Sequence, residues 1–175
     1  MQNIKLLIRQ SYTEAGVKEM NVIQGVLDVL KKMDGEIYDI EFMAGAKAHH
    51  KDNFKQAYED RTGIPFTPIN FRKTRFSLIE ESDAIVVIRT GLSESTAFEL
   101  CYNIQLENPA PMFIAVMDDW EIRTTLLQNL EDIADIEYHS FTEPASLDNA
   151  LSSFLTRVAN NKVEKCRDQE EFEYI

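Results

Sequence analysis

The chain has 175 residues, a formal net charge of −12, 44% hydrophobic residues and 27% charged residues. That length suits one domain with a substantial core and is too short for two comfortable ones. The negative charge argues against a nucleic-acid polymer as partner, and no apolar run is long enough to cross a bilayer. With two cysteines, no signal-like leader and only the adjacent His49-His50 as a histidine pair, we expect a cytoplasmic protein without disulfide, metal or cofactor.

Predicted strands and helices alternate along nearly the whole chain. In order, we expect a strand at 4–8, a helix at 17–33, an edge strand at 36–42, a short helix at 51–60, a helix capped by Asn70 and running to 82, a strand at 84–88, a helix at 97–104, a strand at 111–117, a helix at 118–130, a strand at 133–138 and a last helix from Pro144 or Ser146. This alternation predicts one Rossmann-like α/β domain over residues 1–161, with a mostly parallel sheet covered by helices on both faces. Residues 162–175 are predicted to form a polar, acidic tail that frays or contacts a partner.

The stretch from Ser82 to Glu99 organises the rest of the chain. A run of mainly β-branched residues indicates a buried strand, a turn with one glycine and several hydroxyl residues follows, and a helix comes next. Strand, turn and helix in this order place the turn at the carboxyl edge of a parallel sheet, where open α/β folds bind ligands. The helix offers free N–H groups and a positive dipole end, with the carboxylate of Glu99 one turn inside it.

A small basic cluster precedes that strand in an otherwise acidic protein. It comprises Arg72, Lys73 and Arg75, with Arg61 upstream and Arg89 downstream. The cluster is too small for a duplex-binding surface and is sufficient to hold one phosphate or carboxylate. A solvated helix face is the alternative interpretation of the three residues on the helix.

Residues 72–99 carry a pattern that resembles the Lonely Guy family of nucleoside 5′-monophosphate phosphoribohydrolases. The shared features are the Arg72-Lys73 pair, Asp83 before a buried strand, Gly91, and Thr96 followed three residues later by Glu99. The helix is also similar to the Gly-Thr-x-x-Glu helix of nucleoside 2-deoxyribosyltransferases, which use the glutamate as nucleophile at the anomeric carbon. The resemblance covers about residues 70–158 and implies a Rossmann-like fold and a dimer.

The turn before the helix departs from the Lonely Guy pattern. That family has a glycine-rich turn, whereas this chain keeps only Gly91 between residues 89 and 96. Glycines let backbone N–H groups close on a phosphate. We therefore expect a reshaped cradle that uses hydroxyl groups. The Arg-Lys pair also lies further from Asp83 than in the family, so either Arg72 or Arg75 could supply the basic group.

The resemblance implies cleavage or transfer at the N-glycosidic bond of a nucleoside or nucleoside 5′-monophosphate. Glu99 would stabilise or trap the oxocarbenium-like sugar, and Arg72 or Arg75 would neutralise an anionic group, which makes these three the predicted catalytic residues. The predicted substrate-binding residues are Gly91, Ser93, Ser95, Thr96, Lys73, Arg89 and Ser11, the last in a polar loop after the first strand.

Two other functions stay open on sequence grounds. One is a non-catalytic nucleotide-binding or sensor module on the same fold, which the loss of turn glycines favours. The other is a biosynthetic enzyme that has reused the scaffold for different chemistry. Glu99 can also be read as an ordinary helix glutamate behind a serine N-cap. A homodimer is expected from the resemblance and from the apolar loop Ile64-Pro65-Phe66.

Overall fold

Five parallel strands form one sheet in the order β2-β1-β3-β4-β5. The computed structural model describes residues 3–10, 15–35, 37–43 and 54–172, with side chains described up to residue 163. The strands are β1 (Asn3–Gln10), β2 (Asp39–Met43), β3 (Ala84–Arg89), β4 (Met112–Met117) and β5 (Ile136–Phe141). All four strand pairings are parallel, which confirms the predicted single α/β domain. The alternating strand β2 lies at a sheet edge, as its pattern predicts.

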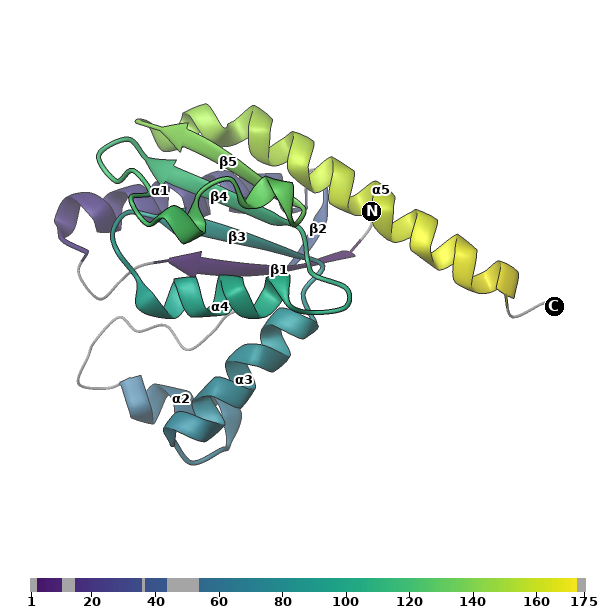
Figure 1. Cartoon of the computed structure of the whole chain (residues 1–175), viewed down its shortest axis with the longest axis horizontal. Coiled ribbons are helices and arrows are strands. Elements are labelled where there is room, and N and C mark those ends of the chain that lie inside the picture. Colours follow the sequence, from purple (N-terminus) through teal and green to yellow (C-terminus); the bar gives the residue numbers. More distant parts are fainter. Residues whose placement is uncertain (1–2, 11–14, 36, 44–53, 173–175) are drawn as a thin grey trace.

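Helices cover both faces of the sheet (Figure 1). One face packs against α1 (Val17–Met33) and α5 (Asp148–Phe172), and the other packs against α3 (Pro68–Glu80) and α4 (Glu94–Ile104). The first core contains Leu6, Val86 and Phe113, and the second contains Leu7, Val87 and Ile114. Alternate residues of each strand therefore enter different cores, as the two-residue period of a strand requires. Because both faces are covered, every residue of β3 and β4 is buried, which explains their continuous apolar runs.

The order of the strands reverses direction at the boundary between β1 and β3. From β1 the chain first adds β2 on one side and then adds β3 to β5 on the other. In doubly wound folds a crevice forms at such a switch point, outside the carboxyl ends of the two strands. Residues Arg9 and Gln10 of β1, and Arg89 at the end of β3, lie at this boundary.

A small aromatic cluster joins α2 (Phe54–Thr62) to the first part of α3. The ring centroids of Phe66 and Phe71 lie 5.8 Å apart, and each lies 5.2 to 5.7 Å from those of Phe54 and Tyr58. The predicted apolar loop thus packs through Phe66 on its own helices, while Ile64 is 42% exposed. Figure 1 shows α2 and the beginning of α3 projecting beyond the sheet.

The prediction of a helix at 118–130 is wrong. The segment instead contains two short 3₁₀ turns, η2 (Thr125–Leu127) and η3 (Leu130–Asp132). Leu126 is 84% exposed, so the apolar residues do not form one buried stripe. β-Branched residues there, such as Ile122, lower helix propensity, and the Gln128 side chain donates to the Ile122 carbonyl at 2.6 Å to stabilise the turn.

Two helix starts also differ from the predictions. Thr67, rather than Asn70, caps α3, since its hydroxyl accepts from the Asn70 N–H and Pro68 occupies the first turn. At the other end of the chain, a 3₁₀ turn, η4 (Pro144–Leu147), comes before α5.

Helix α5 continues past the predicted end of the domain at residue 161 and runs to Phe172, where the sequence predicts a polar tail. Lys162 is tied to the sheet, because its ammonium donates to the Asp83 carboxylate at 2.7 Å. Asp83 also accepts the Lys5 N–H, so it fixes the start of β3. Within the described residues, no helix is long and apolar enough to span a membrane.

Candidate functional site

The carboxylate of Glu99 lies where three elements converge. Glu99 is on α4, Arg9 is near the end of β1 and Arg75 is on α3. The Arg75 Nε–H donates to Glu99 Oε1 at 3.0 Å, and the Arg9 Nε–H donates to Glu99 Oε2. We call these three residues the Glu99 cluster. Each carboxylate oxygen therefore contacts one guanidinium, and the cluster carries one more positive than negative charge.

Burial dominates the electrostatics of the Glu99 cluster. The side chains of Arg75 and Glu99 are 7% and 9% exposed, and that of Arg9 is 16% exposed. Burial raises the pKa of Glu99, and the nearby Arg75 guanidinium offsets only part of that rise. Arg75 Nη2 is also buried and makes no hydrogen bond to the described part of the chain. A perturbed carboxyl beside partly unsatisfied donors is a common feature of functional sites.

Hydroxyl groups gather at the amino end of α4. Ser93 is the N-cap, and its Oγ accepts from the Thr96 N–H at 3.2 Å and from the Thr96 hydroxyl at 2.9 Å. Ser95 Oγ lies 3.2 Å from Ser93 Oγ. Gly91 is buried in the turn before this cap. The N-capping role and the proximity to Glu99 thus coexist on one helix.

The other predicted site residues do not join the Glu99 cluster. Arg72 and Lys73 are exposed on α3. Arg72 precedes Arg75 by about one turn, toward the beginning of the helix, which projects beyond the sheet (Figure 1). Arg89 is buried at the carboxyl end of β3 and contacts a different cavity. Ser11 lies outside the described residues. Of the basic residues predicted from sequence, the structure brings Arg75 to Glu99.

Arg9, Thr90 and Tyr138 are candidate site residues that the sequence analysis missed. Arg9 is two residues beyond Leu7, so both side chains lie on the same face of β1. A charged residue on this face of a buried strand was a signal visible in the sequence. The Thr90 hydroxyl is buried, with no hydrogen-bond partner within the part of the chain that the structure describes. Tyr138 of β5 lines the cavity beside Arg89, and nothing local in the sequence marks it.

Two small cavities, each of about 10 Å³, lie beside α4. The cavity beside the Glu99 cluster is lined by Arg9, Ile79, Ile85, Val87, Thr96, Glu99, Leu100 and Met112. The other, beside Arg89, is lined by Val87, Arg89, Thr96, Ala97, Leu100, Ile114, Ile122, Leu127 and Tyr138. They share Val87, Thr96 and Leu100, so these residues separate them. Each has room for about one water molecule.

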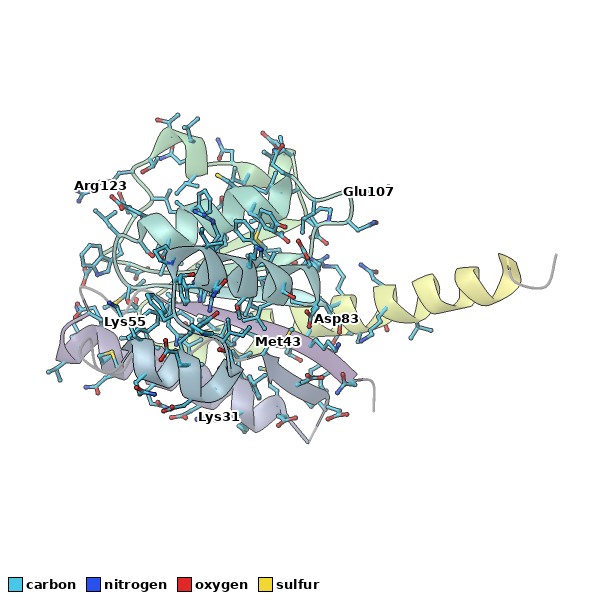
Figure 2. The ribbon with its side chains drawn as sticks, turned by 90° about the horizontal axis from the view of Figure 1, so that it is seen from below. Lys31, Met43, Lys55, Asp83, Glu107 and Arg123 are labelled. Carbon is cyan, nitrogen blue, oxygen red and sulfur yellow. The ribbon has the colours of Figure 1, made fainter. Side chains whose placement is uncertain are left out.

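Figure 2 shows labelled side chains toward both ends of the sheet. Lys55 of α2 and Arg123 lie toward one end of the view, the end to which the strands point in Figure 1, whereas Asp83 and Glu107 lie toward the other. No group of His, Cys, Asp and Glu side chains suited to a metal ion occurs in residues 3–10, 15–35, 37–43 or 54–163.

Comparisons with known proteins identify a related fold. No family model and no curated protein sequence matches this chain. The structure of a CMP N-glycosidase, BcmB, from Clostridium botulinum superposes with a TM-score of 0.54 at 9% identity, covering 85% of this chain and 98% of that one. An FMN-dependent NADH-azoreductase from Bacillus anthracis gives a TM-score of 0.41 at 13% identity, over 92% of this chain and 99% of that one. At this identity the likeness to the CMP N-glycosidase concerns the fold alone.

Proposed function

We propose that this protein cleaves or transfers at the N-glycosidic bond of a nucleoside or nucleoside monophosphate, with Glu99 as the central group. The observation that carries the proposal is a buried carboxylate on α4, bracketed by two guanidinium groups at the β1/β3 switch point. A fold shared with a CMP N-glycosidase supports the choice of substrate class. The resemblance of the Thr96–Glu99 spacing to deoxyribosyltransferases supports the role of the carboxylate.

The chemistry follows from the needs of the bond that breaks. When the bond between C1′ and the base nitrogen opens, its electron pair leaves with the base, which takes up a proton from water. The remaining sugar carries oxocarbenium-like positive charge at C1′. The Glu99 carboxylate stabilises that charge or forms a covalent bond to C1′, and water or a second base then bonds to the same carbon. In the dry surroundings of Glu99, this electrostatic stabilisation is stronger than it is in water.

One guanidinium must exchange partners before a sugar can reach Glu99, because both carboxylate oxygens are already engaged. Arg9 is the more exposed of the two arginines, at 16% against 7% for Arg75, so Arg9 is the one that moves. A hydroxyl or anionic group of the ligand replaces the carboxylate at Arg9, and Oε2 then becomes available. Arg75 keeps Oε1 and holds the side chain in place.

The test is base release by the purified protein from a panel of nucleosides and their 5′-monophosphates, followed by chromatography. Glu99→Gln keeps the side-chain shape and removes the charge, so release is expected to fall by at least about 10²-fold. Arg61→Gln, at an exposed position on α2, is the matched control and is expected to release base at the wild-type rate. If Glu99→Gln releases base as fast as the wild type, this mechanism is wrong.

A nucleotide-binding module without turnover is the second candidate function. It is favoured by the double engagement of Glu99 and by the size of the adjacent cavity, about 10 Å³. A ligand that binds the folded state alone raises the melting temperature. If a nucleotide raises the melting temperature and no member of the panel releases base, this candidate replaces the first.

A further inference from the structure

An aromatic stack joins α3 to α4 and reaches the solvent. The Phe76 ring of α3 stacks on two rings of α4 that are one turn apart. Its centroid lies 3.7 Å from that of Tyr102, with the planes 3° apart, and 5.8 Å from that of Phe98, with the planes 24° apart. Phe98 is 56% exposed, and Ile69, seven residues before Phe76 and on the same side of α3, is 57% exposed. Large apolar side chains that gather on an exposed face are typical of protein–protein interfaces.

Charged residues of opposite sign lie on the two sides of Phe76 along α3. Arg72 and Lys73 come one turn before Phe76, and Glu80 comes one turn after it, so all three share its face of the helix. All three are exposed, and the two cations form no hydrogen bond or ion pair with any residue that the structure describes. The face is therefore basic toward the beginning of α3 and acidic toward its end.

The acidic end of α3 is unfavourable for the helix considered alone. Glu80 is the last residue of α3, Glu81 follows it, and the last turn contains no basic residue. A carboxylate at the carboxyl end of a helix opposes the helix dipole. Within the described residues Glu80 accepts a hydrogen bond from the Tyr102 hydroxyl, and a carboxylate can accept several more. A cation from outside the chain would offset this local conflict.

The charge pattern of α3 is complementary to itself when the helix is reversed. Arg72 lies four residues before Phe76, and Glu80 lies four residues after it. When a second α3 crosses antiparallel at Phe76, Arg72 of each copy faces Glu80 of the partner subunit. The same twofold axis passes close to Phe98 and Tyr102, because both rings contact Phe76, so the aromatic side chains of the two copies meet at the centre. A parallel crossing would place like charges opposite each other, which is unfavourable.

We propose that this protein forms a twofold-symmetric homodimer through α3 and α4, with the two α3 helices antiparallel and crossing at Phe76. The face fits a second copy because its opposite charges are placed symmetrically about the aromatic stack, as an isologous interface requires and an unrelated partner does not. The sequence analysis expected the loop Ile64-Pro65-Phe66 to contribute to a dimer, but Phe66 packs on the chain's own α2 and α3. The proposal does not depend on the proposed function.

The proposed interface is separate from the Glu99 cluster, although the same two helices carry both. Arg75 is next to Phe76 in the chain and Glu99 is next to Phe98, yet Arg75 and Glu99 are buried whereas Phe98 is exposed. A second copy therefore covers the outer side of α3 and α4 without replacing Arg75 as a partner of Glu99. Variants on the exposed face test the dimer and leave the charges of the cluster in place.

Sedimentation equilibrium of the full chain tests the aromatic part of the interface. We expect the wild type to be a dimer at micromolar concentration. Phe98→Asp is expected to raise the dissociation constant at least about 100-fold, since the substitution occurs twice in a symmetric interface. Ile64→Asp, in the loop that the sequence analysis favoured, is the matched control and is expected to dimerise like the wild type.

Three outcomes of this experiment overturn the proposal. One is a Phe98→Asp dimer as tight as that of the wild type, and another is an equal loss of dimer in Ile64→Asp. The third is a wild type that stays monomeric at high micromolar concentration, which would assign the face to a partner of another kind. Circular dichroism checks that Phe98→Asp is folded, as expected for a substitution at an exposed position.

Exchange of the two charges tests the antiparallel arrangement without altering the aromatic stack. Arg72→Glu places carboxylates opposite each other at both ends of α3, so we expect the dissociation constant to rise at least about 10-fold. The double variant Arg72→Glu/Glu80→Arg restores opposite charges and is expected to return to near the wild-type value. Arg61→Glu makes the same change of net charge on α2 and is expected to have no effect. A double variant that dissociates as readily as Arg72→Glu overturns the antiparallel pairing.

Discussion

Two arginine–carboxylate clusters in this molecule have similar chemistry and opposite settings. In the Glu99 cluster, Arg9 and Arg75 hold one carboxylate at the carboxyl side of the sheet. In the second, which we call the Arg157 cluster, Arg157 of α5 donates to Asp135 at 2.5 Å and to Glu137 of β5 at 2.6 Å. Its members are 33% to 45% exposed, against 7% to 16% in the Glu99 cluster.

Burial accounts for the difference between these two clusters. Water screens the Arg157 cluster, which lies beside the first residues of β5 and ties α5 to the edge of the sheet. The Glu99 cluster has lost that solvation and depends on protein groups to replace it. Similar ion pairs therefore serve as a modest surface contact in one place and as a chemically perturbed site in the other.

Truncation of the central carboxylate gives the largest expected contrast. Glu99→Ala leaves two guanidinium groups without an anion, so we expect the free energy of unfolding to fall by about 3–5 kcal/mol. The matched variant Glu137→Ala is expected to cost about 0.2–1 kcal/mol, because its partner stays solvated. Urea unfolding of both variants measures the two values. Equal losses would contradict the role assigned to burial.

Removal of one guanidinium should have a smaller effect. Arg75→Met keeps much of the side-chain volume, and Glu99 still has Arg9, so we expect a loss of about 1.5–3 kcal/mol, the value of a hydrogen bond to a charged group. The same urea experiment applies. A variant as stable as the wild type would show that Arg75 does not stabilise the ionised carboxylate.

The stability contributed by the exposed Arg157 cluster should depend on salt concentration, unlike that of the buried Glu99 cluster. Arg157→Gln is expected to lower the free energy of unfolding by about 0.2–1 kcal/mol at low salt, and by less at about 1 M salt, where the Debye length is short. The loss in Arg75→Met is expected to change little with salt because the pair is buried. Unfolding curves at the two salt concentrations check this, and a salt-independent loss in Arg157→Gln would go against the comparison.

The last contrast concerns the direction in which the pKa of each central glutamate is shifted. Burial raises the pKa of Glu99, so the folded state binds the proton more readily than the unfolded state. Its contribution to stability is then fully present below the ordinary glutamate pKa and is lost as pH rises through the higher folded pKa. For Glu137 burial acts the same way, but hydrogen bonds from Arg157 and His139 outweigh it and hold the pKa below its usual range. Its contribution is present above the ordinary value and is lost as pH falls through the lower folded pKa.

Stability differences between wild type and the two glutamine variants measure this sign. As pH falls from about 7 toward about 4, the free energy of unfolding of the wild type relative to Glu99→Gln should increase. As pH falls further, the free energy of unfolding relative to Glu137→Gln should decrease. The same direction of change in both pairs would show that the two carboxyls are perturbed alike.

Most of the fold could be predicted from the sequence because most helices and strands produce a pattern within their own residues. The buried runs of β3 and β4 and the apolar stripe of α1 each depend on a period within one element. The segment at 118–130 was misread because its apolar residues are not a stripe: Leu127 is buried while Leu126 is exposed. Such a segment takes its conformation from the turns and core it meets, which no local period records.

The candidate site was predictable only in part. Glu99 and Arg75 were expected at the site because of the family resemblance, and the structure brings them together, whereas Arg72 and Lys73, which are basic like Arg75, remain exposed. The charge of Arg9 on a buried strand face was visible in the sequence, but its pairing with Glu99 spans 90 positions and no local pattern predicts it.

The sequence by itself determined the alternation of strands and helices and placed a carboxylate on the helix after the central strand, because both depend on neighbours in the chain. Tertiary structure alone decided that Arg9 and Arg75 pair with this carboxylate, and that the buried Nε of Arg89 makes no hydrogen bond within the described residues. The physical reason is that the energy of a charge depends on what surrounds it after folding. Those surroundings are assembled from β1, β3, α3 and α4, which lie far apart in the chain.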